Sequence, residues 1–307
     1  MKFMEMLNNA WDKSKSLVCV GLDPDLNKLP ACVREKEHPI FEFNKALIDA
    51  TADLVCCYKP QIAYYAGQSA DEDLLMTMRY LKKNHPAIPV ILDAKRADIG
   101  ATTNMYAHEA FERFEADAVT VNPYMGMDAI KPFLDHADKG VVVLCRTSNP
   151  GAKEIQEIKT ADGIELYKHV AKLIAGPWNY NGNTLLVAGA TFPEELGEIR
   201  RIVGDVPLLV PGIGAQGGDV EKVMKNGVDS RGNGLIINSS RGIIYASDGD
   251  DFAEAARKYS VGPNKEKGGD MGPVEWDKLN PEWSERLNDM RPGDVTPLFN
   301  IQKNIKA

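Results

Sequence analysis

Residues 93–99, which read D-A-K-R-A-D-I, hold the densest group of side chains in the chain that could act on a substrate. They end an apolar run with the composition of a buried β-strand. Because residues two apart in a strand face the same way, we expect Asp93 and Lys95 to point to the same place. Alternating lysines and aspartates keep each lysine protonated, since every ammonium is flanked by carboxylates. Such a lysine can donate a proton, whereas a Schiff base requires a neutral amine.

Two further charged residues belong with this group. Lys59 ends an earlier apolar run and should lie within reach of both Asp93 and Lys95. The alternative for Asp93 and Lys95 is an ordinary ion pair, although a cluster of opposite charges at the opening of a pocket more often marks a functional site. Asp98 has two interpretations that the spacing leaves open. It could take part in the chemistry, or it could cap a helix that we predict to begin near Gly100.

A second candidate site is rich in glycine. Residues 211–219 read P-G-I-G-A-Q-G-G-D and precede a helical pattern, and residues 238–242 read N-S-S-R-G. Glycine lets backbone N–H groups approach an anion closely, and a helix N-terminus favours negative charge. Arg241 adds a guanidinium whose donors match phosphate oxygens. A glycine-rich turn alone is weak evidence, but with an arginine after the next apolar run it predicts phosphate binding.

The order of elements predicts the scaffold for these side chains, a (β/α)8 TIM barrel of the α/β class. Most of the apolar runs are continuous, as in parallel strands buried on both faces, and amphipathic segments separate them. Eight such units match this barrel, whose catalytic groups lie at the C-terminal ends of the strands. A doubly wound open sheet is the alternative, but no edge-like pattern of Pro or Lys favours it. The predicted strands are residues 17–23, 54–60, 88–95, 118–123, 141–147, 184–191, 207–214 and 234–240.

Two segments lie outside this pattern of repeated units. Near the N-terminus, Phe3, Leu7 and Trp11 recur every four positions, which predicts an amphipathic helix rather than a signal peptide. From Gly262 onward the chain is rich in Pro, Gly and mixed charges but still holds tryptophans and other large apolar residues. We therefore expect a barrel domain over residues 1–261 and an irregular C-terminal extension over 262–307, packed on the barrel or partly disordered.

The composition excludes several functions. Among 307 residues, Lys and Arg total 36 against 44 for Asp and Glu, a formal net charge of −8. Binding to nucleic acid or to an anionic membrane by bulk electrostatics is therefore not expected. The apolar runs are much shorter than the roughly 20 residues that cross a bilayer. Five cysteines without a C-x-x-C pair indicate reduced thiols and a cytoplasmic protein.

The motifs DAKRADIGATT, SNPGA and PGIGAQGGD, with the Arg-Gly pair after the eighth strand, together resemble orotidine 5′-phosphate decarboxylase. Within that family, LDAKR-x-DIG-x-T and VNPYMG resemble the longer bacterial branch, and the resemblance spans from about Val18 to about Ser247. It implies a TIM barrel and a homodimer with shared active sites. It also implies conversion of orotidine 5′-monophosphate to UMP and CO2 without cofactor or metal, the last step of de novo pyrimidine synthesis.

The resemblance also implies roles for individual residues. Lys59, Asp93, Lys95 and Asp98 would form a charged tetrad, in which Lys95 protonates C6 of the pyrimidine and Asp93 lies beside the departing carboxylate. Asp98 and Thr102 would reach into the partner subunit's site. Loss of CO2 leaves a lone pair in the ring plane that the π system cannot delocalise, so the site must supply a fixed positive charge and then a proton.

The remaining implied contacts bind the rest of the nucleotide. The ribose hydroxyls would contact Asp23 and Lys59, and the pyrimidine ring would contact Ser148. The phosphate would be bound by Gln216, Gly217, Gly218 and Arg241.

Two other functions fit part of this pattern. A metal-dependent sugar-phosphate aldolase or decarboxylase of a related barrel shares D-x-K-x-x-D. Such an enzyme would need an acidic metal ligand at the second strand. Lys59 stands there, and an ammonium beside a divalent cation is unfavourable. A non-catalytic nucleotide-binding barrel is the second alternative, but binding alone gives no reason for the array of charges.

Overall fold

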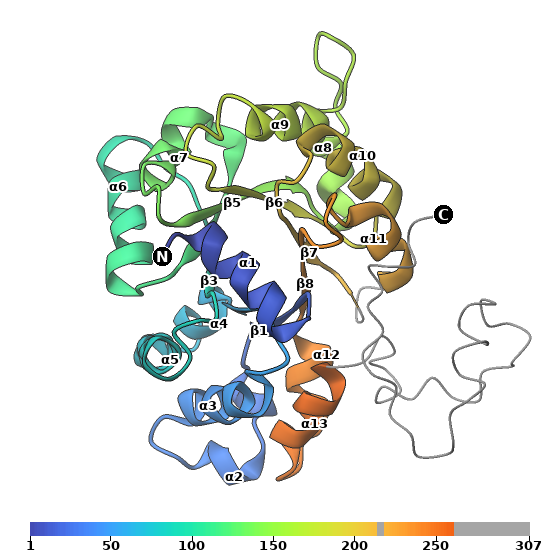
Figure 1. Ribbon diagram of the computed structural model, residues 1–307. Helices are drawn as coiled ribbons and strands as arrows, with labels where there is room; N and C mark the ends of the chain where they lie inside the picture. Colours follow the sequence, from blue (N-terminus) through green and yellow to red (C-terminus); the bar gives the residue numbers. More distant parts are fainter. Residues whose placement is uncertain (214–217, 261–307) are drawn as a thin grey trace, which may run out of the picture.

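Eight parallel strands form one sheet in the computed structural model, which describes residues 1–213 and 218–260. Their order is β2-β1-β8-β7-β6-β5-β4-β3, and isolated bridges from Tyr58 to Val90 and from Gln61 to Asp93 join β2 to the β3 side. The sheet therefore curls into a nearly closed barrel, which confirms the predicted TIM barrel over the open sheet (Figure 1). The strands are β1 (Val18–Leu22), β2 (Cys57–Pro60), β3 (Ile91–Arg96), β4 (Ala118–Val121), β5 (Gly140–Arg146), β6 (Thr184–Ala188), β7 (Leu208–Pro211) and β8 (Leu235–Ser239).

Helices lie between the strands and surround the barrel (Figure 1). They are α1 (Phe3–Ser14), α2 (Ala31–Arg34), α3 (Pro39–Thr51), α4 (Ile62–Ala66), α5 (Asp71–Asn84), α6 (Gly100–His108), α7 (Met127–Leu134), α8 (Lys153–Gln156), α9 (Leu166–Ala175), α10 (Pro193–Val203), α11 (Val220–Gly227), α12 (Arg241–Ile244) and α13 (Phe252–Ser260). Short 3-10 turns cover Leu26–Lys28, Pro123–Met125 and Pro150–Ala152, and a π-helical turn covers Glu109–Arg113. Over residues 1–213 and 218–260, no helix has the length and apolar character needed to cross a membrane.

The N-terminal helix closes one end of the barrel. As predicted, Phe3, Leu7 and Trp11 lie on one buried face of α1, where they pack against the side chains of the barrel interior. The Trp11 indole N–H donates to the Leu235 carbonyl at 3.0 Å, and Phe3 lies against Gly140 so closely that a Cβ there would meet its ring at 2.5 Å. Both partners begin their strands, so α1 covers the N-terminal ends (Figure 1). The opposite, C-terminal end is left for the site.

The last described helix completes the ring around the barrel. The ring of Phe252, in α13, stacks on that of Phe43, in α3, with 5.0 Å between centroids. The Arg257 guanidinium pairs with the Asp53 carboxylate at 2.7 Å. These contacts join α13 to α3 and to the segment that follows α3, so α13 belongs to the ring of helices around the strands. The predicted extension over residues 262–307 lies outside the described residues.

A single arginine connects the segments that precede β7 and β8, at the N-terminal end of the barrel. The guanidinium of Arg200, in α10, donates to the carbonyls of Gly204 and Val206 before β7 and of Gly227 and Gly234 before β8, at 2.5–2.9 Å. Burial lowers the pKa of Arg200 to about 10, because the cation has left water while the carbonyls around it are neutral. The Gly234 carbonyl also accepts from the Leu208 N–H at 2.9 Å, which pairs it independently of Arg200.

We expect Arg200→Met to lower the free energy of unfolding by about 2–4 kcal/mol, because it removes charge-assisted bonds and leaves carbonyls unpaired. Urea unfolding followed by circular dichroism measures the change. Arg201→Met, at the exposed neighbouring position of the same helix, is the control and should change stability by less than about 0.5 kcal/mol. An equal loss of unfolding free energy for the two variants would contradict this role of Arg200.

Candidate active site

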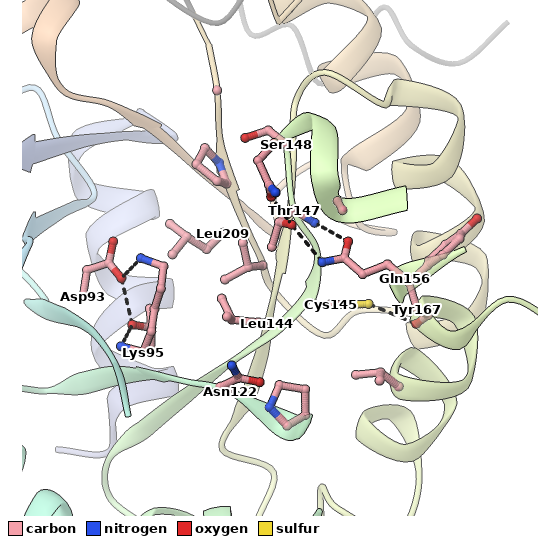
Figure 2. Close-up of a pocket in the computed structure, with 18 of the residues that line it drawn as sticks. Asp93, Lys95, Asn122, Leu144, Cys145, Thr147, Ser148, Gln156, Tyr167 and Leu209 are labelled. Atoms are coloured by element: carbon pink, nitrogen blue, oxygen red, sulfur yellow. Dashed lines mark hydrogen bonds and ion pairs between the residues drawn. The ribbon is translucent and has the colours of Figure 1, made fainter. Parts of the chain in front are cut away.

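A cavity of about 1170 Å³ opens at the C-terminal ends of the strands. Charged and polar side chains from several strand ends face one another across it, as Figure 2 shows for Asp93 and Lys95 opposite Thr147 and Ser148. Leu144 and Leu209 lie between the two sides (Figure 2). The predicted site residues that line the cavity are Asp23, Lys59, Asp93, Lys95, Ser148 and Arg241.

Asp93 joins two lysines at the centre of the charged group. Its Oδ2 lies 2.9 Å from Lys59 Nζ, and its Oδ1 lies 2.6 Å from Lys95 Nζ. Lys59 and Asp93 are buried, whereas the Lys95 side chain keeps 45% of its surface exposed to the cavity. The array therefore has a shielded interior and one ammonium that a substrate can reach.

The pKa values of the buried members follow from this pairing. Burial alone would raise the pKa of Asp93, but the ammonium groups of Lys59 and Lys95 outweigh it and hold the pKa well below its usual range. Burial likewise acts to lower the pKa of Lys59, and the carboxylates of Asp93 and Asp23 reverse the effect and raise it. The two groups stay ionised at neutral pH, so the site presents fixed charges.

Asp23, at the end of β1, extends the array. Its Oδ1 lies 4.0 Å from Lys59 Nζ. That oxygen is buried and accepts no hydrogen bond from the residues that the structure describes. A buried acceptor beside an ammonium is suited to a hydroxyl donor on a ligand, because an unpaired polar atom is costly to keep out of water.

A bulge, rather than regular strand alternation, brings Asp93 and Lys95 together. Leu92 pairs with Val119 of β4, and the next pair is Arg96 with Val121, so residues 93–95 of β3 stand opposite one residue of β4. Lys95 takes φ +49°, in the left-handed region that residues other than glycine seldom occupy. Asp93 and Lys95 therefore do lie together as predicted, but a bulge and not regular strand alternation brings them there.

Asp98 and Thr102 stand apart from this cluster. Helix α6 begins at Gly100 as predicted, but its N-cap is Ile99, and no side chain caps it. The Asp98 carboxylate instead accepts from the Ile99 N–H at 2.8 Å, so the capping interpretation is wrong. Thr102 is exposed on α6. Within the described chain, no ion pair or hydrogen bond joins either residue to Lys59, Asp93 or Lys95.

Sequence reasoning missed the network that shapes the loop carrying Ser148. Arg146, at the end of β5, is only 1% exposed, pairs with Glu157 at 2.6 Å and lies 4.0 Å from the centre of the Phe192 ring. The Gln156 side chain accepts from the Thr147 N–H at 2.9 Å and donates to its hydroxyl at 2.8 Å (Figure 2). The one signal was a charged residue inside an apolar strand, and such a residue must find partners in the fold.

Gly212 and Ile213, at the described start of the glycine-rich segment, and Arg241 line the same cavity at the rim of the barrel. No side chain would fit at Gly218, since a Cβ there would meet Ala190 Cβ and the Gly212 carbonyl oxygen at 2.6 Å. Arg241 begins α12 after β8 and is exposed to the cavity. The predicted phosphate ligands Gln216 and Gly217 lie outside the described residues.

The fold and site define a class: a parallel barrel with an ionised Lys–Asp array and a guanidinium at the open end, arranged for an anionic substrate. The sequence profile described as the orotidine 5′-phosphate decarboxylase / HUMPS family matches residues 16–259. The chain belongs to this family.

Similar proteins agree with this family. Over 261 residues the chain is 56% identical to orotidine 5′-phosphate decarboxylase from Dechloromonas aromatica, covering 85% of this chain and 96% of that protein. It is 56% identical to the protein of the same name from Cellvibrio japonicus, with the same coverage. A solved structure of OMP decarboxylase from Leishmania donovani is 37% identical, with a TM-score of 0.72, covering 84% of this chain and 99% of that one.

A second profile, described as a PPIC-type PPIASE domain, matches residues 244–305. The described part of this match, residues 244–260, contains α13, which packs on α3 as part of the barrel. The match covers far less than half of the chain, so it shows no second family.

The pairing of Asp93 predicts how stability depends on pH. In the unfolded chain the pKa of an aspartate is about 3.9. The folded pKa of Asp93 is lower, so its carboxylate stabilises the fold above about pH 4, and this contribution is lost as the pH falls toward the folded pKa. We expect Asp93→Asn to unfold at a lower urea concentration than the parent near neutral pH. The difference between the two urea midpoints should narrow below about pH 4.

Urea midpoints measured at several pH values between neutral and 3 test this expectation. Asp12→Asn, at an exposed position of α1, is the control, and its urea midpoint should differ little from that of the parent at every pH. A difference in midpoint for Asp93→Asn that is the same at every pH would count against the pairing of Asp93 with the two lysines.

Proposed function

We propose that this chain decarboxylates orotidine 5′-monophosphate to UMP and CO2, the last step of de novo pyrimidine synthesis. The observation that carries the proposal is the Lys59–Asp93–Lys95 array in a chain that matches named decarboxylases over nearly their whole length. The chain is an enzyme of the carboxy-lyase class. We propose that it needs no cofactor or metal and acts in the cytoplasm.

Lys95 is the proposed proton donor. When the bond between C6 and the carboxylate breaks, the electron pair stays on C6 in the plane of the ring. The Lys95 ammonium stabilises this charge and then transfers a proton to C6, and the neutral amine regains a proton from solvent. The exposure of Lys95 to the cavity and its short contact with Asp93 support this role.

Asp93 and Lys59 hold this ammonium in place. The carboxylate of Asp93 lies between the two cations, so a substrate carboxylate bound near Lys95 would also lie near Asp93. Lys59 and Asp23 would bind the ribose hydroxyls, and Asp23 Oδ1, which accepts no hydrogen bond from the described residues, supports that contact. Contacts far from C6 supply binding energy that orients the ring for reaction.

The other proposed contacts complete the nucleotide site. Ser148 lines the cavity opposite Lys95 and would contact the pyrimidine ring. Gly218 and Arg241, on the rim of the barrel, would bind the phosphate together with Gln216 and Gly217.

We further propose a homodimer in which Asp98 and Thr102 complete the partner's site. Ile99, which follows Asp98, and Met105, in the same helix as Thr102, are large apolar side chains exposed to 59% and 66%. Exposed apolar side chains of this size favour association with a second protein surface. A second copy packed on Ile99 and Met105 would lie close to Asp98 and Thr102.

The activity is tested by following the absorbance of orotidine 5′-monophosphate in the presence of EDTA. We expect full turnover by the parent protein in chelator, because the charges that act on C6 are side chains. Lys95→Ala should lower kcat by at least about a thousandfold while still binding UMP, since both the charge and the proton are lost. Activity that requires added Mg²⁺, or substantial turnover by Lys95→Ala, would contradict the proposed mechanism.

Shared sites predict complementation between two inactive variants. Equal amounts of Lys95→Ala and Asp98→Ala, unfolded together and refolded, should recover about a quarter of parental activity, because half of the dimers are mixed and each holds one intact site. A differential affinity tag on each variant isolates the mixed dimers. Isolated mixed dimers without activity would exclude sharing through Asp98.

A further inference from the structure

The bulge in β3 creates a problem that the backbone alone does not solve. Between the pairs Leu92–Val119 and Arg96–Val121, the regular ladder between β3 and β4 is interrupted. The N–H groups of Ala94 and Lys95 fall in this gap and need other acceptors. Their acceptor therefore decides the shape of the chain between the two charged side chains.

Thr120, the residue of β4 opposite the bulge, takes up both donors. Its hydroxyl oxygen accepts from the N–H of Ala94 and from that of Lys95, each at 2.9 Å. The same hydroxyl donates to Asp93 Oδ1 at 2.8 Å. A hydroxyl has one donor and two acceptor positions, so all three are used. The residue is 1% exposed.

Asp93 Oδ1 is therefore held from two sides. It accepts from the Thr120 hydroxyl and from the Lys95 ammonium at 2.6 Å, while Oδ2 faces Lys59. The backbone of Lys95 is held at φ +49°, which persists only where surrounding contacts define it well. One hydroxyl thus fixes both the carboxylate and the backbone from which the ammonium extends.

We propose that Thr120 is a positioning residue for the reaction, which orients Asp93 and keeps Lys95 in its left-handed conformation. The inference rests on the proposed decarboxylation. Thr120 acts through these two residues, because its three hydrogen-bonding positions are all occupied by them and by Ala94. A displacement of about 1 Å at a reacting group can cost a hundredfold in rate, so this hydroxyl has a large effect on kcat.

Thr120→Val tests the hydroxyl because valine keeps the shape of threonine and removes both the donor and the acceptors. We expect kcat for orotidine 5′-monophosphate to fall by about ten- to a hundredfold, with KM changed less than about threefold. Thr120→Ser retains the hydroxyl and should keep kcat within about threefold of the parent. Hydrogen exchange of the Ala94 and Lys95 amides should accelerate in the valine variant and not in the serine variant.

Thr184→Val is the matched control. Thr184 lies in β6 and is buried like Thr120, but its hydroxyl has no hydrogen-bond partner among the described residues. The control should leave kcat, KM and exchange at Ala94 and Lys95 unchanged. Folding of each variant is checked by circular dichroism before the kinetics.

The outcomes separate this inference from the proposed function. Absence of decarboxylation by the parent protein would refute the proposed function, while the exchange measurement would still test the contacts of Thr120. An active parent with equal kcat for Thr120→Val and Thr184→Val would overturn the inference. A folded Thr120→Ser variant with a kcat as low as that expected for Thr120→Val would also overturn it. The measurement on Thr120→Ser can be made even if Thr120→Val does not fold.

Discussion

The structure depends on keeping the Asp93 carboxylate ionised inside the protein. A buried charge is costly unless it is paired and hydrogen-bonded, and Asp93 has the ammonium groups of Lys59 and Lys95 on either side with the Thr120 hydroxyl as a third donor. These donors come from β2, β3 and β4. The array therefore exists only when these three strands lie side by side, and the closure of the barrel between β2 and β3 is a condition for it.

The two ends of the barrel have opposite tasks. Helix α1 fills the N-terminal end with Phe3, Leu7 and Trp11, and burial of such side chains contributes roughly 1.5–3 kcal/mol each. Arg200 ties strand entrances together on the same side. Stability built there leaves the C-terminal ends free to hold polar groups that the core would not tolerate, among them Lys59 and Asp93. The separation of stability from chemistry follows from the parallel direction of all eight strands.

Sequence periodicity predicted the elements well because it reports burial. All eight apolar runs became strands, and the spacing of Phe3, Leu7 and Trp11 predicted α1, since a residue's face in a helix or strand depends only on local geometry. Six of the predicted site residues line the cavity, because strand ends in a parallel barrel meet at one rim, whereas Asp98, Thr102 and Gly218 do not line it. Arg146 escaped this reasoning, because its partners Glu157 and Phe192 are brought to it only by the fold.

The sequence by itself therefore determined the barrel, the end of it that carries chemistry, and the family to which the chain belongs. Only the tertiary structure decided how the charged groups meet. The bulge in β3, the left-handed backbone of Lys95 and the three hydrogen bonds of Thr120 all arise from the register between β3 and β4. The structure also decided between the two interpretations of Asp98, whose carboxylate accepts from the adjacent Ile99 N–H and does not cap α6. Register is a pairing between distant segments, and no local pattern of residue types encodes it.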